Sequence, residues 1–93
     1  MVDARLLVLV SLSDGPKHGY AIQTDVDGFA AVRLGPGTLY GALSSLERDG
    51  LVEALPSEER RRPYQLTARG RQQIGQQLDE LERIRQRATS ALT

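Results

Sequence analysis

The stretch GPGTLYGALSSLERDG, residues 35–50, carries the signals that decide the fold. Proline suits the first position of a helix and the glycine before it is an acceptable N-cap, so a helix is expected to begin near Pro36. Three leucines recur at the spacing of one helical face and predict its buried side: Leu39, Leu43 and Leu46. Asp49 and Gly50 are expected to end this helix.

The opposite side of the same helix is small and polar apart from one arginine. A turn of about 100° per residue places Gly41 and Arg48 opposite the leucines, flanked by Ser44 and Ser45. Such a face lets another large molecule approach the helix backbone closely. The candidate contact residues are Gly37, Thr38, Tyr40, Gly41, Ser44, Ser45 and Arg48. For two of them an alternative stays open: Tyr40 can pack half-buried with a solvated hydroxyl, and Thr38 can satisfy a local amide.

Two short β-type stretches follow the helix, at residues 51–55 and 62–66, and the polar, proline-containing segment between them predicts a hairpin with a long tip. Pro63 is expected at a strand start or edge, because proline cannot donate to a ladder. Arg60, Arg61 and Arg62 are consecutive in this hairpin. A solvated run of charge is the alternative, but three arginines beside an open helix face favour contact with DNA.

Two helices are expected before residue 35. The first, residues 3–13, is apolar on most sides, and Asp14-Gly15-Pro16 ends it. The second covers residues 17–26, with Gly28 as its stop. An apolar face is predicted for it from the spacing of Ile22, Val26 and Phe29. His18 and Tyr20 are expected to pack at the start of this helix rather than to bind a ligand.

A last helix is expected over residues 68–92, with Thr67 as its N-cap. Its apolar side is too short to predict a coiled coil, but a helix of this length projects beyond a small domain unless a partner covers it. The candidate dimerisation residues are Ile74, Leu78, Leu81, Ile84, Arg85, Ala88 and Leu92. We therefore divide the chain into a DNA-binding domain, residues 1–67, and a dimerisation helix, residues 68–93.

The 93 residues carry twelve basic and twelve acidic side chains, a net charge of zero that argues against nucleic-acid binding by itself. The charges are segregated, however. Residues 60–78 contain five arginines and no acid, whereas residues 1–28 carry two basic and four acidic side chains. Because phosphate contacts depend on the local potential within about 8 Å at physiological salt, a distant acidic segment does not cancel the basic one.

Composition excludes several classes of protein. The chain has no cysteine and one histidine, so no convincing metal set or pair of nucleophile and base can be assembled, and we expect neither an enzyme nor a cofactor. The apolar run at residues 6–10 is far shorter than the ~20 residues that cross a bilayer, and no secretion signal is recognisable. We expect a cytoplasmic protein without a membrane partner.

The order of elements predicts a mainly α fold with a small β-hairpin: a winged helix-turn-helix followed by a long C-terminal helix. In such folds the third helix enters the major groove of DNA, and the hairpin, called the wing, touches the flanking backbone.

Four stretches then resemble the PadR family of transcriptional regulators. They are HGYAI at 18–22, GPGTLYGAL at 35–43, LERDGLV at 46–52 and RRPYQLT at 61–67, with Gly70 following at the usual place. The short chain with a single C-terminal helix is similar to the compact branch of that family.

The resemblance implies a homodimeric DNA-binding regulator, usually a repressor, that dimerises through its last helix. Some members of the family release DNA when an aromatic compound binds near the dimer interface, so a small-molecule effector there is a partner that the resemblance allows. The alternative is a winged-helix module for protein interaction or effector sensing without useful DNA affinity. Glu58, Glu59 and the neutral total charge favour this alternative.

Overall fold

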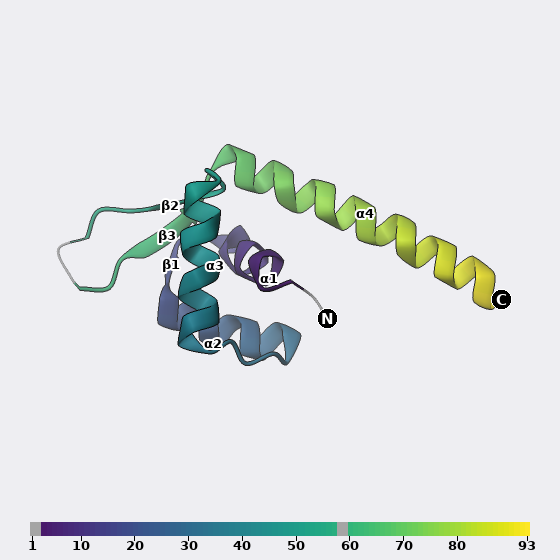
Figure 1. The fold of residues 1–93 in the computed structure, drawn as a ribbon, viewed down its shortest axis with the longest axis horizontal. Coiled ribbons are helices and arrows are strands. Elements are labelled where there is room, and N and C mark those ends of the chain that lie inside the picture. The colour runs from purple at the N-terminus through teal and green to yellow at the C-terminus, as the bar shows by residue number, and fades with distance from the viewer. Residues whose placement is uncertain (1–2, 58–59) are drawn as a thin grey trace.

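The computed structural model describes residues 3–57 and 60–93 of the chain. Figure 1 shows a cluster of short helices and strands from which one long helix extends. The elements are α1 (Ala4–Ser11), the 3-10 turn η1 (Leu12–Asp14), β1 (Lys17–His18), α2 (Gly19–Ala30), α3 (Pro36–Arg48), β2 (Val52–Ala54), β3 (Pro63–Leu66) and α4 (Ala68–Leu92). The expected class, a mainly helical winged helix-turn-helix with a long C-terminal helix, is confirmed.

Helix α3 begins and ends where its local signals predict. Gly35 is the N-cap and Pro36 the first helical residue, and the amide of Leu39 donates to the Gly35 carbonyl at 2.9 Å. Asp49 is the C-cap, and Gly50 follows with φ +76°, in the left-handed region that favours glycine. The three predicted leucines are at most 1% exposed, so the buried side of α3 is as expected.

The first two helices differ from their expected bounds. The first is shorter, since the chain tightens into η1 after Ser11. The second begins at Gly19 rather than Lys17, and it runs through Gly28 to Ala30. Its end is set by Ala31, whose φ of +53° leaves the helical region. Gly28 was wrong as the stop because a glycine inside a helix lowers stability without having to end the helix.

Two side chains predicted to be buried on α2 are exposed. Phe29 is 48% exposed, and the core next to it is completed by Ala30 and Val32 instead. Tyr20 is 66% exposed, so its expected packing role was wrong. The buried Ile22 is two positions further along the helix, and the rotation of about 200° between the two residues turns the tyrosine to the outside.

The sheet has three antiparallel strands in the order β1-β3-β2, one more than expected. Strands β2 and β3 pair Val52 with Leu66 and Ala54 with Tyr64, within the predicted hairpin. The additional strand, β1, pairs Lys17 with Tyr64 and His18 with Pro63. Pro63 starts β3, as predicted. Strand β1 places the beginning of α2 directly beside the hairpin.

His18 occupies the start of α2, as expected, and it does so as the N-cap. Its Nδ1 atom accepts a hydrogen bond from the amide of Ala21 at 3.4 Å. The histidine therefore connects β1 to α2.

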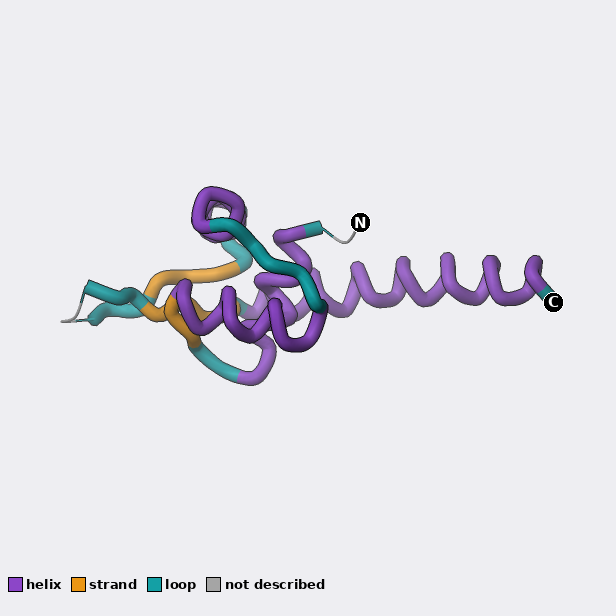
Figure 2. The backbone as a smooth tube through the Cα atoms, turned by 90° about the horizontal axis from the view of Figure 1, so that it is seen from below, coloured by secondary structure: helices purple, strands orange, loops and turns teal. Residues whose placement is uncertain are grey.

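Helix α4 is anchored only at its beginning. Thr67 is the N-cap, as predicted: its hydroxyl accepts from the Gly70 amide at 3.1 Å and donates to the Gly50 carbonyl at 2.7 Å. Helix α1 packs against this part of α4, and Ile74 is partly buried against the core. From Leu78 to the end, every residue is exposed. Figure 2 shows the hairpin and the free end of α4 at opposite ends of a molecule that is 55 Å long.

Candidate nucleic-acid interface

The outer side of α3 is open, as its sequence predicts. Of the seven candidate residues on this helix, six are exposed: Gly37, Thr38, Tyr40, Gly41, Ser44 and Arg48. We call these six residues the α3 outer face. A Cβ atom added at Gly37 or Gly41 would meet nothing within 4 Å, so the helix backbone is accessible there.

Ser45, the seventh candidate, is turned toward α1. Its side chain is half-buried, and its hydroxyl accepts a hydrogen bond from the guanidinium of Arg5. The same guanidinium forms an ion pair with Asp49 at 2.9 Å. Arg5 thus links α1 to the last turn of α3, and Ser45 takes part in this link instead of in the open face.

The three candidate arginines of the wing, the hairpin formed by β2, β3 and the segment between them, are all exposed. In the described ranges, no hydrogen bond or ion pair engages the guanidinium of Arg60, Arg61 or Arg62. Their positive charges are therefore available to an external anion. Glu58 and Glu59, which favour the alternative of an interaction module, lie outside the described residues.

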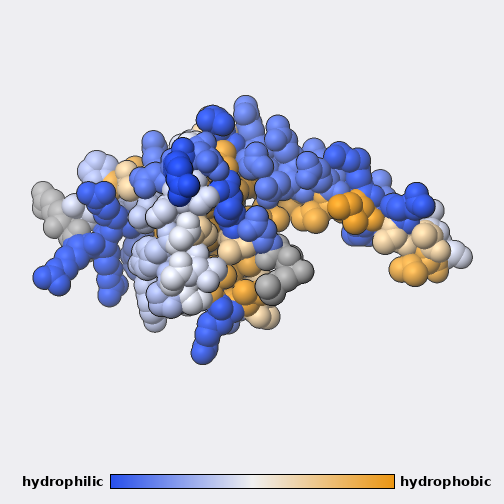
Figure 3. Space-filling view, in the orientation of Figure 1, coloured by the Kyte–Doolittle hydropathy of each residue, from blue (hydrophilic) through white to orange (hydrophobic). Residues whose placement is uncertain are grey.

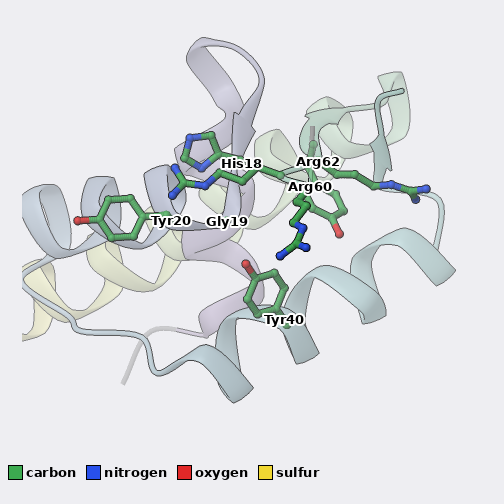
Figure 4. Close-up of a pocket in the computed structure, with 8 residues that line it drawn as sticks. His18, Gly19, Tyr20, Tyr40, Arg60 and Arg62 are labelled. Carbon is green, nitrogen blue, oxygen red and sulfur yellow. The ribbon is translucent and has the colours of Figure 1, made fainter. Parts of the chain in front are cut away.

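A cavity of about 270 Å³ lies where the start of α2, the middle of α3 and the wing meet. We call it the wing cavity. Figure 4 shows one arginine guanidinium of the wing close to the Tyr40 hydroxyl, while another arginine of the wing extends away from both Tyr20 and Tyr40. The lining residues are His18, Gly19, Tyr20, Tyr40, Arg60, Arg61, Arg62 and Tyr64. None of these is acidic, so the cavity combines aromatic hydroxyls with positive charge.

Four residues of the wing cavity were not among the candidates from sequence: His18, Gly19, Tyr20 and Tyr64. The first three belong to a motif that we interpreted as packing, and Tyr64 belongs to a strand. They join the arginines because β1 pairs with β3, a contact between distant parts of the chain. The one available signal was the run of aromatic and basic residues in RRPYQ, next to the hairpin tip.

Tyr40 owes its position to a glycine. A Cβ atom at Gly19 would lie 2.5 Å from the Tyr40 hydroxyl oxygen and 2.9 Å from Cζ, closer than any real contact. The tyrosine ring therefore lies against the backbone at the start of α2. Gly19 thus allows a close approach between α2 and a side chain of α3. The ring remains 52% exposed, between the core and the outer face.

The chemistry of Tyr64 is set by its surroundings. Burial raises the pKa of this phenol, and the carboxylate of Glu47 raises it further. Like that of an ordinary tyrosine, its hydroxyl is protonated at neutral pH and is able to donate a hydrogen bond.

The candidate dimerisation residues divide into two groups. Ile74 belongs to the edge of the core, whereas Leu78, Leu81, Ile84 and Leu92 are between 47% and 86% exposed. Ala88 is exposed as well. We call these last five residues the α4 stripe. Figure 3 shows apolar surface along the side of α4 that faces down in this view.

Arg85 lies at the edge of the α4 stripe and is paired within its own helix. Its Nε and Nη2 atoms donate to the two carboxylate oxygens of Glu82 at 3.1 and 2.8 Å. This pairing lowers the pKa of Glu82 and raises that of Arg85. The pair keeps a guanidinium beside an otherwise apolar surface without leaving its charge uncompensated.

Two other kinds of site were sought in the described part of the chain. Residues 3–57 and 60–93 contain no group of three His, Cys, Asp or Glu side chains that could hold a metal ion. The same ranges contain no helix long and apolar enough to cross a membrane.

Comparison with known proteins adds an independent result. Residues 8–76 match the model of the "Transcriptional regulator PadR-like family". A protein of Streptomyces fradiae, described as an uncharacterized 37.1 kDa protein in transposon TN4556, is 45% identical over 82 residues. The match covers 88% of this chain but 24% of that protein, so the chain spans about a quarter of the length of this curated relative.

Solved structures extend the similarity to the whole fold. A PadR family transcription regulator from Clostridium difficile is 25% identical with a TM-score of 0.88, covering 99% of this chain and 100% of that one. A transcriptional regulator from Clostridium thermocellum is 26% identical with a TM-score of 0.83, covering 94% of this chain and 87% of that one.

Proposed function

Because the chain belongs to the PadR-like family of transcriptional regulators, we propose that it is a cytoplasmic, sequence-specific repressor that binds double-stranded DNA as a homodimer. Residues 1–67 are the DNA-binding domain and residues 68–93 the dimerisation helix. In this proposal α3 enters the major groove and the arginines of the wing contact the backbone. The role as a repressor rests on the family resemblance.

The observation that carries the DNA-binding proposal is the meeting of two surfaces. The wing cavity is lined both by Tyr40 of the α3 outer face and by the three wing arginines, so a helix face made largely of small residues lies directly beside arginines that have no ion-pair partner among the described residues. DNA presents both complementary features, because its major groove admits a helix and its backbone carries phosphates along the groove edges. Small side chains on α3 would let the helix axis approach the base edges.

The α4 stripe supports the homodimer. Its free part, from Leu78 to Leu92, is about 22 Å long at 1.5 Å per residue, and all of its residues are exposed. An apolar helix face of this length is best buried against a second copy of the same helix. The dimer would present its two α3 helices to half-sites one turn of DNA apart, ~34 Å.

The experiment that tests this function selects a duplex from a random pool with the purified protein and measures affinity for it by fluorescence anisotropy across a salt series. Steep salt dependence is expected, because each phosphate contact contributes a slope of about −0.9 in log K against log salt. The double variant Arg61→Ala, Arg62→Ala should bind all sequences more weakly, with a slope that is about two units shallower per subunit.

Arg83→Ala is the control for a loss of positive charge outside the wing, because it removes one guanidinium from an exposed position on the distant part of α4. It should leave the slope unchanged. An unchanged slope in the wing variant would contradict the role of the wing. Failure to enrich any duplex, together with a stable complex with another protein, would instead support the interaction module suggested by the neutral total charge.

A further inference from the structure

We propose that the wing cavity is a binding site for a single phosphate of the DNA backbone, and that Gly19 creates this site by allowing Tyr40 to lie against the start of α2. The inference rests on the proposed function, since it names what one cavity of the DNA-binding surface holds. It assigns one ligand to Tyr40, for which packing was the alternative, and to Tyr64, and it gives Gly19 a role in shaping their site.

The first support is the chemistry of the lining. An oxygen anion is bound best by charged and hydroxyl donors, and the described lining of the cavity contains tyrosines and three arginines but no carboxylate. Figure 4 shows the hydroxyl of Tyr40 turned toward the cavity, whereas the hydroxyl of Tyr20 points away from it. In the described ranges, no hydrogen bond engages the hydroxyl of Tyr20, Tyr40 or Tyr64. The donors of the cavity are thus not consumed by contacts within the domain.

The second support is size and shape. The cavity volume of about 270 Å³ exceeds the ~30 Å³ that one water occupies by enough to admit a phosphate group with part of its hydration shell. Its walls come from three separate elements, α2, α3 and the wing, and these would surround the ligand rather than touch it from one side.

The third support is the position of Tyr40. One side of its ring lies against the backbone of Gly19, which restricts the positions open to its hydroxyl. A side chain that is restricted before binding loses less conformational entropy when it contacts its ligand. On the opposite wall Tyr64 keeps its proton at neutral pH and can donate to a second oxygen.

The fourth support is the place of the cavity relative to α3. Tyr40 is the neighbour of Gly41, at the middle of the helix that enters the groove. A helix in the major groove has a phosphate row on either side. The wing cavity lies on the wing side of α3, where one of these rows passes, so a DNA backbone phosphate suits the site better than an anion free in solution.

The test uses the full-length protein and the enriched duplex, carrying one neutral methylphosphonate at a time along each strand. For the natural protein, a methylphosphonate at one position per half-site should lower the affinity by about tenfold, as expected for a lost charge-assisted contact. Tyr40→Phe removes one hydroxyl and should weaken binding to the unmodified duplex. At that one position, however, the methylphosphonate should lower the affinity of the variant by a clearly smaller factor than it lowers the affinity of the natural protein.

A second variant, Gly19→Ala, forces Tyr40 out of its position and should reproduce the effect of Tyr40→Phe. Gly28→Ala is its matched control, because a Cβ there meets nothing within 4 Å and lies on the same helix. The control should bind like the natural protein. If Gly19→Ala fails to fold, Tyr40→Phe still decides the question, since it removes a single exposed oxygen.

If a methylphosphonate lowers the affinity of Tyr40→Phe and of the natural protein by the same factor at every position, the phosphate site is wrong although DNA binding stands. Salt-independent binding, or no enriched duplex at all, would instead reject the proposed function itself. A phosphorus NMR titration with inorganic phosphate completes the test. Saturable submillimolar binding that is lost in Tyr40→Phe would assign the cavity to a free phosphate ligand and overturn its assignment to DNA.

Discussion

The α3 outer face and the α4 stripe are both helix surfaces without a partner in the described chain. They differ in chemistry, because the first is small and polar and the second is apolar. The first is made of glycines, hydroxyls and one arginine, next to uncompensated positive charge. The second is made of aliphatic side chains that are up to 86% exposed. A small, polar surface has little free energy to gain from leaving water, whereas burial of an apolar stripe is favourable by about 25 cal/mol for every Å².

This difference teaches that the two surfaces can be perturbed separately. Stability of the monomer comes from the core beneath α3, which neither surface enters. Binding of DNA should depend on charge and close approach, and self-association on apolar burial. Mutations that act on one surface and spare the other therefore decide whether the division is real.

The largest effect is expected from Leu78→Asp combined with Leu81→Asp. Each change would place an unpaired charge in the buried centre of the dimer and cost about 3 kcal/mol per subunit. Sedimentation at micromolar concentration should show monomers, with the monomer fold retained in circular dichroism because both leucines are exposed there. Gln76→Asp adds a charge on the other side of α4 and should leave the dimer intact. A dimer of natural strength in the double variant would show that α4 is not the interface.

The next effect concerns the junction between the wing and α4. A Cβ atom at Gly70 would lie 2.1 Å from the backbone carbonyl oxygen of Leu51, so Gly70→Ala must displace the first turn of α4. We expect a loss of about 2–3 kcal/mol in the free energy of unfolding, measured by thermal or urea denaturation.

Gly75→Ala is the control for this junction, because its Cβ would meet nothing within 4 Å. Alanine is the better helix former, so this variant should gain up to ~1 kcal/mol of stability. Equal stabilities of the two variants would mean that α4 is not held at Gly70.

The smallest effect is expected from Gly41→Gln on the α3 outer face. An added Cβ meets nothing within 4 Å there, so stability should rise by up to ~1 kcal/mol, as for any good helix former that replaces glycine. The side chain would nevertheless stand between the helix and the groove, and DNA affinity should fall about tenfold. Gly75→Gln should give the same gain in stability without the loss in affinity. Unchanged affinity in Gly41→Gln would remove α3 from the interface.

Much of the fold could be predicted because its signals are local. Gly35 and Pro36 predict the start of α3, and Thr67 predicts the start of α4. All three occupy the expected positions at the helix N-termini. The leucine spacing of α3 identified its buried side correctly. These features depend on neighbours within one or two helical turns, which a sequence displays directly.

The errors concern features that depend on distant residues. Lys17 and His18 were assigned to a helix, although they form a strand, because their partner strand begins only at Pro63. Tyr20 was expected to pack, and Ser45 was expected on the open face, where instead Arg5 of α1 draws it inward. No local pattern reveals such contacts, because each partner lies in another element.

The amino-acid sequence by itself determined the helices α3 and α4, their polar and apolar faces, and the separation of basic from acidic segments, since these follow from residue spacing along one chain. Only the tertiary structure decided that Tyr40, Tyr64 and the wing arginines share a cavity and that Gly19 is what leaves room for Tyr40. The physical reason is that a cavity is enclosed by pairing between β1 and β3, and strand pairing over a long loop is settled by the packing of the whole domain.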